Sequence, residues 1–123
     1  MPLYGMVWKA NITKMVSQFE IWWVNLAPTV GVETQKTRPC LVVSCDSLNK
    51  GQLVFIAPFL KGVQPRFYAV NVEPSPFNNL DMQRRVDLRQ MRSVDKARFK
   101  QKLGMLEEKY HASIHKALDV LFK

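Results

Sequence analysis

Hydrophobic and polar positions divide the chain into a strand-rich first part and a helical end. Residues 19–26 are rich in aromatic and β-branched side chains, a composition typical of a strand. Residues 40–44 form a nearly continuous apolar run, which predicts a central strand buried on both faces. Further strands are predicted at residues 52–57, 67–72 and 85–91.

Proline, glycine and polar residues mark the connections between these strands. Pro58 follows the third predicted strand and is expected to end it. The stretch 46–51 (DSLNKG) has turn chemistry, and polar loops are predicted at 28–37 and 61–65.

After residue 92 the period becomes helical. Ser93 is a suitable N-cap for a short helix that runs to about Lys102, and Gly104 can end it. From Leu106 to Leu121, apolar residues recur at helical spacing and predict a longer helix with one apolar face. With strands first and helices last, the fold class is α+β: a small, strongly bent antiparallel sheet with C-terminal helices packed against it.

The length of 123 residues and a hydrophobic content of 47% are those of one domain with its own core. We assign residues 19–123 to this domain and residues 1–18, which lack a clear period, to an N-terminal arm. Apolar runs fall short of the roughly 20 residues of a membrane span, and the first residues lack the pattern of a secretory signal. A cytoplasmic protein without membrane association is therefore predicted.

Positive charge dominates the composition: 18 Lys and Arg stand against 10 Asp and Glu, a formal net charge of +8. Such an excess can simply keep a small domain soluble, but the cations also cluster between residues 84 and 102. Clustering favours a polyanionic partner, either a nucleic acid or an acidic protein that masks the surface.

The sequence offers few groups for metal, cofactor or nucleophilic chemistry. Cys40 and Cys45 are an odd number of positions apart in one apparent strand, so they point to opposite faces and do not readily bridge. His111 and His115 stand four apart on the last helix without a third metal ligand. The sequence has neither a Gly-rich phosphate loop nor a GxSxG motif. We therefore expect no metal site and no cofactor.

Arg38 is the first candidate for chemistry. It lies where the loop 28–37 leads through Pro39 into a buried strand, so its guanidinium is held on a rigid base. From there it can contact a phosphate through two hydrogen bonds, or stabilise charge on a reacting phosphate. The alternative is a structural role in which Arg38 ties the loop down through Glu33 or Asp46. The spacing leaves both open.

Asp87 and Arg89 form a second candidate pair. Residues i and i+2 of a strand share a face, so both side chains can orient one substrate, with Gln90 and Arg92 nearby in the sequence. The alternative is an ion pair on a solvated face, which the pattern alone favours.

Lys61 and Arg66 flank the second polar loop. Lysines in such places usually keep an edge or a turn soluble. These two residues become phosphate contacts only if their loop lies beside Arg38.

One stretch resembles a known family. The run EIWWVNLAPTVGVETQKTRPCLVVS, which starts at Glu20, is similar to the opening of the MazF/PemK toxins, whose pattern is roughly GDIWWVDLDPTxGxEQxKxRPxLVVS. The resemblance continues through IAPFLKG and LRQMRSVDKARF and covers about Phe19 to Phe122. Its most specific part is the spacing of Glu33, Lys36 and Arg38 before a proline.

The resemblance implies an SH3-like barrel with C-terminal helices, and a homodimer. It implies a metal-independent endoribonuclease that cuts single-stranded RNA, in which the RNA 2′-hydroxyl attacks the adjacent phosphate and leaves a cyclic phosphate. It also implies a growth-inhibiting toxin of a type II toxin–antitoxin system. The cognate antitoxin of such a toxin, often with an acidic, disordered tail, covers the RNA groove.

Site residues follow from the matching positions. Arg38 matches the catalytic arginine of the family. The loop that gates and contacts RNA is matched by Glu33, Gln35, Lys36 and Thr37, and Gln90 and Arg92 match a strand that lines the RNA groove.

Four positions depart from the family pattern. Leu60 stands where many members have a Ser or Thr that assists catalysis, and Val32 stands where some have a His. Asp87 and Arg89 occur in the reverse of the Arg-x-Asp order found in others.

These residues lead to a working hypothesis and two alternatives. Arg38 stabilises the transition state, Asp87 is the base, and Arg89 contacts the phosphate; Lys61 and Arg66 add RNA contacts. The alternatives are a non-catalytic member that binds a protein target, as the gyrase poison CcdB of the same fold does, and a member that only binds RNA or its antitoxin.

Overall fold

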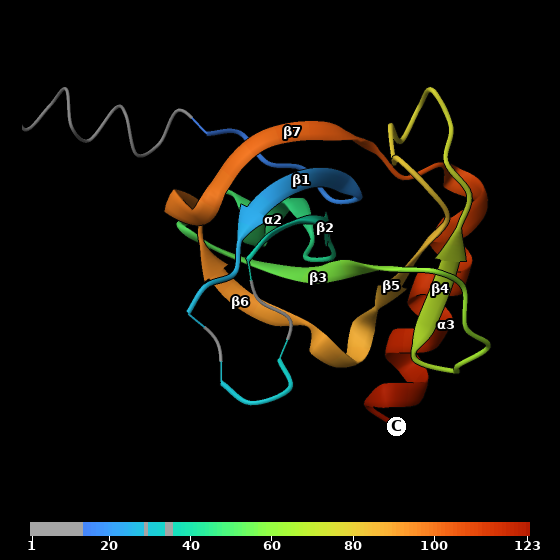
Figure 1. Ribbon diagram of the computed structural model, residues 1–123. Helices are drawn as coiled ribbons and strands as arrows, with labels where there is room; N and C mark the ends of the chain where they lie inside the picture. Colours follow the sequence, from blue (N-terminus) through green and yellow to red (C-terminus); the bar gives the residue numbers. More distant parts are fainter. Residues whose placement is uncertain (1–13, 29, 34–35) are drawn as a thin grey trace, which may run out of the picture.

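An antiparallel sheet of seven strands, strongly bent around its own interior, forms the body of the protein (Figure 1). The structure is a computed structural model and describes residues 14–28, 30–33 and 36–123. The strands are β1 (Glu20–Asn25), β2 (Thr37–Val42), β3 (Leu53–Lys61), β4 (Ala69–Val72), β5 (Arg84–Asp87), β6 (Arg92–Asp95) and β7 (Phe99–Met105). The helical elements are α2 (Asp46–Asn49), three 3-10 turns, η1 (Leu88–Gln90), η2 (Lys96–Arg98) and η3 (Glu108–Tyr110), and α3 (His111–Leu121).

β3 organises the sheet because it pairs with two different strands along one edge. The strand order is β4-β5-β3-β2-β1-β7, and β6 also pairs with β3. Residues 53–56 of β3 pair with β6, whereas residues 59–61 pair with β5. β6 and β7 are joined through η2 without pairing to each other, so the pairings among the described strands form a bent, open sheet and not a closed ring.

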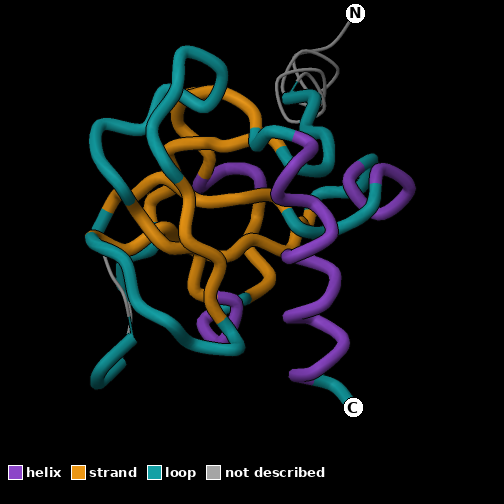
Figure 2. The backbone as a smooth tube through the Cα atoms, turned by 90° about the vertical axis from the view of Figure 1, so that its right-hand side faces the viewer, coloured by secondary structure: helices purple, strands orange, loops and turns teal. Residues whose placement is uncertain are grey.

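Two apolar clusters occupy the two faces of this sheet. In β1, Ile21 belongs to the cluster that α3 covers, while its neighbour Trp22 belongs to the cluster inside the bend. In β2, Leu41 and Cys40 divide in the same way. Burial on both faces explains the continuous apolar run of the sequence. Figure 2 shows α3 lying along one side of the strands.

The predicted α+β class, the first two strands, the fourth strand and the last helix are confirmed. Three predictions are wrong. The strand expected to stop at Pro58 continues to Lys61, and the strand predicted at 85–91 ends at Asp87, where η1 begins. The C-terminal part contains one α-helix, preceded by the single turn η3.

The third error is the helix predicted from Ser93 to Lys102, where the chain forms β6, η2 and β7. Val94 and Phe99 are buried in the cluster inside the bend, and only strands that pair with β3 and β1 can bring both there. The capping signal in this stretch belongs to Asp95, whose carboxylate accepts a hydrogen bond from Ala97 N–H and starts η2. Tertiary pairing thus overrides the local helical pattern.

The end of the predicted N-terminal arm is part of the domain. Lys14 Nζ donates hydrogen bonds to the carbonyl oxygens of Lys96 (2.9 Å) and Phe99 (2.7 Å), which flank the η2 corner. Val16 is buried in the cluster inside the bend, and Gln18 Nε2 donates to Val43 O. Residues 1–13 of the arm lie outside the described residues.

Glu20 ties the start of β1 to its surroundings. Its Oε1 accepts from Ser17 N–H (2.8 Å) and from the Trp22 indole (3.0 Å), and its Oε2 lies 2.8 Å from Lys102 Nζ. Burial raises the pKa of this carboxyl, but the hydrogen bonds from Lys102, Ser17 and Trp22 outweigh burial and hold the pKa below its ordinary value.

Gly104 sits in β7 where the backbone of another segment passes closely. A Cβ at this position would lie 2.6 Å from Asn78 O and 2.7 Å from Phe77 O. Gly104 is therefore required by a close approach within the sheet layer, and not by the helix end predicted for it.

We expect Gly104→Ala to lower the free energy of unfolding by about 1–3 kcal/mol. The added methyl group would push the carbonyl oxygens of Phe77 and Asn78 away from β7. Gly51→Ala is the matched control, since a Cβ there would meet Leu48 O at an ordinary 3.5 Å. Urea unfolding followed by tryptophan fluorescence measures both. Equal stabilities for the two variants would contradict the close approach.

We expect the free energy of unfolding of Glu20→Gln to fall less than that of the parent when the pH is lowered. A carboxyl whose folded pKa lies below its unfolded value, about 4.3, contributes its full stabilisation above that value. This stabilisation is lost as the pH falls below the unfolded pKa and through the folded pKa. The variant should be less stable than the parent at pH 7, with a smaller further loss between about pH 5 and pH 3. Glu108→Gln, at an exposed glutamate, should keep the parental pH dependence.

Candidate active site

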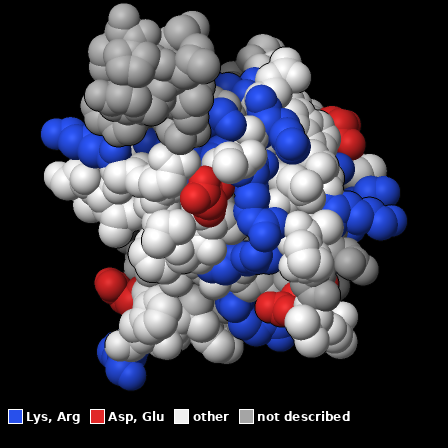
Figure 3. Space-filling model, turned by 90° about the vertical axis from the view of Figure 1, so that its left-hand side faces the viewer, with Lys and Arg blue, Asp and Glu red and all other residues white. Residues whose placement is uncertain are grey.

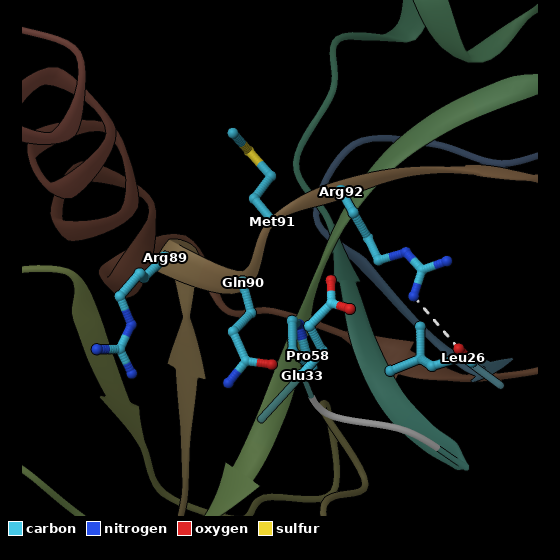
Figure 4. A pocket seen from close by; sticks show the side chains of 7 residues that line it. All are labelled: Leu26, Glu33, Pro58, Arg89, Gln90, Met91 and Arg92. Carbon is cyan, nitrogen blue, oxygen red and sulfur yellow. Dashed lines mark hydrogen bonds between the residues drawn. The ribbon is translucent and has the colours of Figure 1, made fainter. Parts of the chain in front are cut away.

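A pocket opens where β3 changes its partner from β6 to β5. It has a volume of about 160 Å³ and is lined by Leu26, Glu33, Pro58, Arg89, Gln90, Met91 and Arg92 (Figure 4). Pro58 lies between the β3 residues paired with β6 and those paired with β5. The chain between β5 and β6 crosses this gap through η1, which brings Arg89 and Gln90 to the pocket wall.

Asp87 fixes the polar wall of the pocket. It is the N-cap of η1, and its Oδ1 accepts from Arg89 N–H at 3.0 Å. Its Oδ2 accepts from Gln90 Nε2 at 3.3 Å and lies 3.5 Å from Arg89 Nη2. The Asp87 side chain is only 2% exposed, whereas that of Arg89 is 61% exposed. A buried carboxylate thus holds a solvent-facing guanidinium, which also lies 4.4 Å from the centre of the Tyr68 ring.

Asp87 and Arg89 lie beside each other as an ion pair of 3.5 Å, but not through the shared strand face that the sequence predicted. Both residues were expected to project from one strand, but Asp87 ends β5 and Arg89 lies in the 3-10 turn that Asp87 caps. The backbone turn, and not a shared strand face, brings the two side chains together.

Arg38 and Arg92 approach the same buried thiol from two strands. Burial raises the pKa of the Cys40 thiol strongly, and the positive charges of Arg92 and Arg38 act in the opposite direction. Arg92 Nη1 also donates to Leu26 O at 3.2 Å, which fixes its guanidinium at the pocket (Figure 4). Two guanidinium groups therefore lie near Cys40, at one end of the bent sheet.

The register places Leu60 on the same face as Arg38. Cys40 pairs with Pro58 across β2 and β3, and paired residues share a face of the sheet. Arg38 and Leu60 are each two positions away from this pair, on the same side of it, so both belong to that face. The β2–β3 pairing itself ends at Cys40 and Pro58, and beyond it Leu60 pairs with Arg85 of β5.

The loop between β1 and β2 reaches the pocket through Glu33. Its carboxylate accepts from Val30 N–H at 2.8 Å and lies among the side chains of Gln90 and Arg92 (Figure 4). Arg98 Nη1 donates to the carbonyl oxygens of Asn25 and Ala27, which secures the start of this loop. The end of the loop is secured by Leu26 N–H, which bonds to Lys36 O at 3.0 Å.

Comparison with known proteins identifies the family. Residues 17–122 match the family described as "PemK-like, MazF-like toxin of type II toxin-antitoxin system". The chain belongs to this family. Endoribonuclease MazF of Staphylococcus epidermidis is 29% identical over 108 residues, which cover 86% of this chain and 90% of that protein. Endoribonuclease MazF of Staphylococcus saprophyticus is 28% identical over 109 residues, with the same coverage.

Solved structures share the fold. MazF from Deinococcus radiodurans has a TM-score of 0.75 at 22% identity, over 89% of this chain and 97% of that one. A mycobacterial endoribonuclease in complex with its cognate antitoxin has a TM-score of 0.71 at 17% identity, over 87% and 94% of the two chains.

The structure of this MazF-like toxin brings part of the predicted site together. Glu33, Arg89, Gln90 and Arg92 line one pocket, Asp87 holds two of them, and Arg38 lies on the adjoining strand. Lys36 and Thr37 are exposed at the start of β2. Lys61 is exposed at the end of β3 and Arg66 in the loop that follows, and none of these four residues lines the pocket. Gln35 lies outside the described residues.

Sequence reasoning missed four contributors. Leu26, Pro58 and Met91 line the pocket, and Tyr68 supports Arg89. Met91 could have been suspected because it stands between two predicted site residues. Pro58 was interpreted only as a strand end, and no local signal indicated Leu26 or Tyr68.

The face beside the pocket is strongly basic. Figure 3 shows a band of Lys and Arg side chains on the side of this toxin that carries β6, η2 and the beginning of β7. The cations on these elements that are not buried are Arg92, Arg98, Lys100 and Lys102, whereas Lys96 is buried. Such a band attracts polyanions towards the pocket.

Two further observations concern the rest of the described chain. Within it, no three or more His, Cys, Asp and Glu residues group in a way that could hold a metal ion. None of its helices has the length and apolar character needed to cross a membrane.

Proposed function

We propose that this toxin is a metal-independent endoribonuclease that cleaves single-stranded RNA, including mRNA, in the cytoplasm and thereby inhibits growth. The observation that carries the proposal is the pocket at the point where β3 changes partner, which Arg89 and Arg92 line, with Arg38 on the neighbouring strand β2. The staphylococcal relatives named Endoribonuclease MazF support the same activity.

In the proposed reaction, the RNA 2′-oxygen attacks the adjacent phosphorus and the bond from phosphorus to the 5′-oxygen breaks. The products are a 2′,3′-cyclic phosphate and a 5′-hydroxyl. Negative charge builds up on the phosphate oxygens in the transition state, and guanidinium groups held in advance stabilise it. Arg38 supplies this stabilisation and Arg89 contacts the phosphate.

Asp87 is the proposed base that takes the 2′-hydroxyl proton, and the departing 5′-oxygen takes up a proton from water. The burial of Asp87 and the hydrogen bonds from Arg89 and Gln90 also give it a positioning role, because they fix both side chains at the pocket wall. The two roles differ in kinetics. Loss of a base lowers kcat, whereas loss of positioning alone also raises KM.

Leu60 sets a limit on the rate. A leucine neither donates nor accepts a proton, so the side chain at position 60 supplies no hydroxyl to the reaction. We propose that catalysis relies more heavily on the guanidinium groups here than it would with a Ser or Thr at this position.

The remaining loop residues are proposed to bind the RNA on either side of the cut. Glu33 and Gln90 present hydrogen-bonding groups at the pocket, and Arg92 presents a cation there. Farther RNA contacts are assigned to Gln35, Lys36, Thr37, Lys61 and Arg66.

A cognate antitoxin is the proposed protein partner. The mycobacterial endoribonuclease was solved with its antitoxin, and the MazF of D. radiodurans was solved with MazE. An acidic segment that covers the basic band and the pocket would compete with RNA for the same positive charge.

A second copy of this chain is the other proposed partner. A shallow apolar depression of about 490 Å³ is lined by Val43, Ser44, Phe55, Met91, Leu118 and Phe122. Phe55 is 39% exposed and Phe122 is 72% exposed. Aromatic side chains gathered in one exposed patch are typical of an interface. We propose that this patch, continuous with the pocket through Met91, is covered in a homodimer.

Arg38→Ala should lower cleavage of a long single-stranded RNA in EDTA by about 10²–10³-fold, because a donor that stabilises the transition state is lost. Gel electrophoresis of the parent should show discrete cuts. Lys50→Ala, at an exposed lysine beyond α2, is the control and should cut normally. Asp87→Asn, tested beside it, separates the base role from the positioning role through kcat and KM.

Full cleavage by Arg38→Ala would refute the assignment of this residue. If the parent binds RNA but makes no cuts, the site with Leu60 is not catalytic, and the binding-only function holds. A chain that leaves RNA intact and traps gyrase on DNA would instead be a poison of the CcdB type.

Phe55→Glu should convert the dimer to monomers at micromolar concentration, because it places a charge in an apolar interface. Phe77→Glu, at another exposed phenylalanine outside the patch, should leave the mass unchanged. Size-exclusion chromatography with light scattering measures the mass. A dimer that survives Phe55→Glu would place the interface elsewhere.

A further inference from the structure

A second groove lies on the opposite side of β5 from β3, between the outer edge of β4 and the helix α3. Its volume is about 720 Å³. It is lined by Phe67, Ala69, Val70, Asn71, Lys109, Tyr110, Ser113, Lys116, Ala117 and Val120. In Figure 1, β4 passes in front of α3 at the right of the view. The groove is separate from the proposed active site and shares no lining residue with it.

One wall of the groove is an open strand edge. β4 is the last strand in the sheet order, and in the described chain only β5 pairs with it. Leu88 N–H donates to Tyr68 O. Because backbone groups alternate in direction along a strand, those of Tyr68, Val70 and Val72 point towards β5. Ala69 and Asn71 therefore direct their backbone groups outward. Ala69 N–H is bonded to Arg66 O, which leaves the backbone of Asn71 at the open edge.

The side chain of Asn71 keeps this edge in place. Asn71 lies on the face away from Val70 and Val72, which belong to the cluster under α3. Its Oδ1 accepts from Gln64 N–H at 3.1 Å and its Nδ2 donates to Gln64 O at 3.2 Å. Gln64 is thus held on the far face and does not line the groove, whereas Phe67, nearer to β4 in the same loop, does.

The other walls are apolar and positive. Phe67 is 64% exposed and Val120 is 40% exposed. Lys109 and Lys116 project from the helical side, and the residues that line the groove include no acid. Neither lysine takes part in an ion pair within the described residues. Positive charge at this groove is therefore not neutralised by the chain itself.

We propose that this groove binds an extended, acidic segment of a partner protein, which adds to the sheet as a strand beside β4. The outward N–H and C=O groups of a strand edge form hydrogen bonds with the backbone of an added strand. A nucleic acid does not offer donors and acceptors in that pattern. Apolar side chains of the segment pack against Phe67 and Val120, and its carboxylates lie near Lys109 and Lys116. The four residues of β4 fit a segment of four to six residues, which spans about 13–20 Å.

The experiment uses the full chain and fluorescein-labelled peptides of alternating glutamate and valine. Fluorescence anisotropy should show saturable binding of this acidic peptide. A peptide with lysine in place of glutamate should bind at least about tenfold more weakly, a difference of about 1.4 kcal/mol. Methylation of alternate backbone nitrogens on one edge of the acidic peptide should abolish binding, because it removes the hydrogen bonds of strand addition while the protein stays unaltered.

Two protein variants locate the site. Lys109→Glu combined with Lys116→Glu should weaken the acidic peptide at least about tenfold. Both residues are exposed, so the fold should be retained, and circular dichroism checks this. Lys50→Glu, which makes a charge change outside the groove, should bind as the parent does.

Three outcomes would overturn the proposal. Equal binding of acidic and basic peptides would remove the role of charge, and undiminished binding of the methylated peptide would remove strand addition. The third outcome concerns a single-stranded RNA oligonucleotide. If this RNA binds the parent, displaces the acidic peptide and no longer binds the double lysine variant, the groove is a nucleic-acid site.

Discussion

The divided pairing of β3 is the constraint on which the rest of the structure depends. The first half of β3 pairs with β6 and its second half pairs with β5, so the sheet bends between the two halves. Pro58, which has no N–H to donate, stands at the division. The gap left there becomes the pocket, and the chain that closes it carries Arg89 to Arg92. The position of the site is therefore a consequence of how the sheet is connected.

The cations of this protein are held mainly by backbone carbonyls at the basic end. Arg92, Arg98 and Lys14 donate to carbonyl oxygens, which orient them without cancelling their charge. Lys102 is an exception, because it forms an ion pair with Glu20. Where a carboxylate does meet a pocket guanidinium, at Asp87, the acid is buried and the arginine is exposed. This arrangement leaves a positive face towards a polyanion.

Sequence patterns predicted the elements whose signals were local and strong. The apolar runs of β1 and β2 and the helical spacing of α3 are of this kind, and so is the loop that carries Glu33. The helix predicted from Ser93 failed because long-range pairing with β3 decides that segment. The strand end predicted at Pro58 was wrong for a related reason. A proline ends a strand only where its missing N–H would have bonded to a neighbouring strand.

The polar members of the pocket were predictable from the sequence, but its apolar members and its geometry were not. Glu33, Gln90 and Arg92 were named from the sequence and do meet at one pocket. Their meeting depends on the 3-10 turn after β5, a feature too short to leave a clear period. One member of the pocket, Met91, is also part of the apolar patch beside it. Whatever covers that patch also touches the pocket wall, so binding at the patch and the shape of the pocket are linked through one side chain.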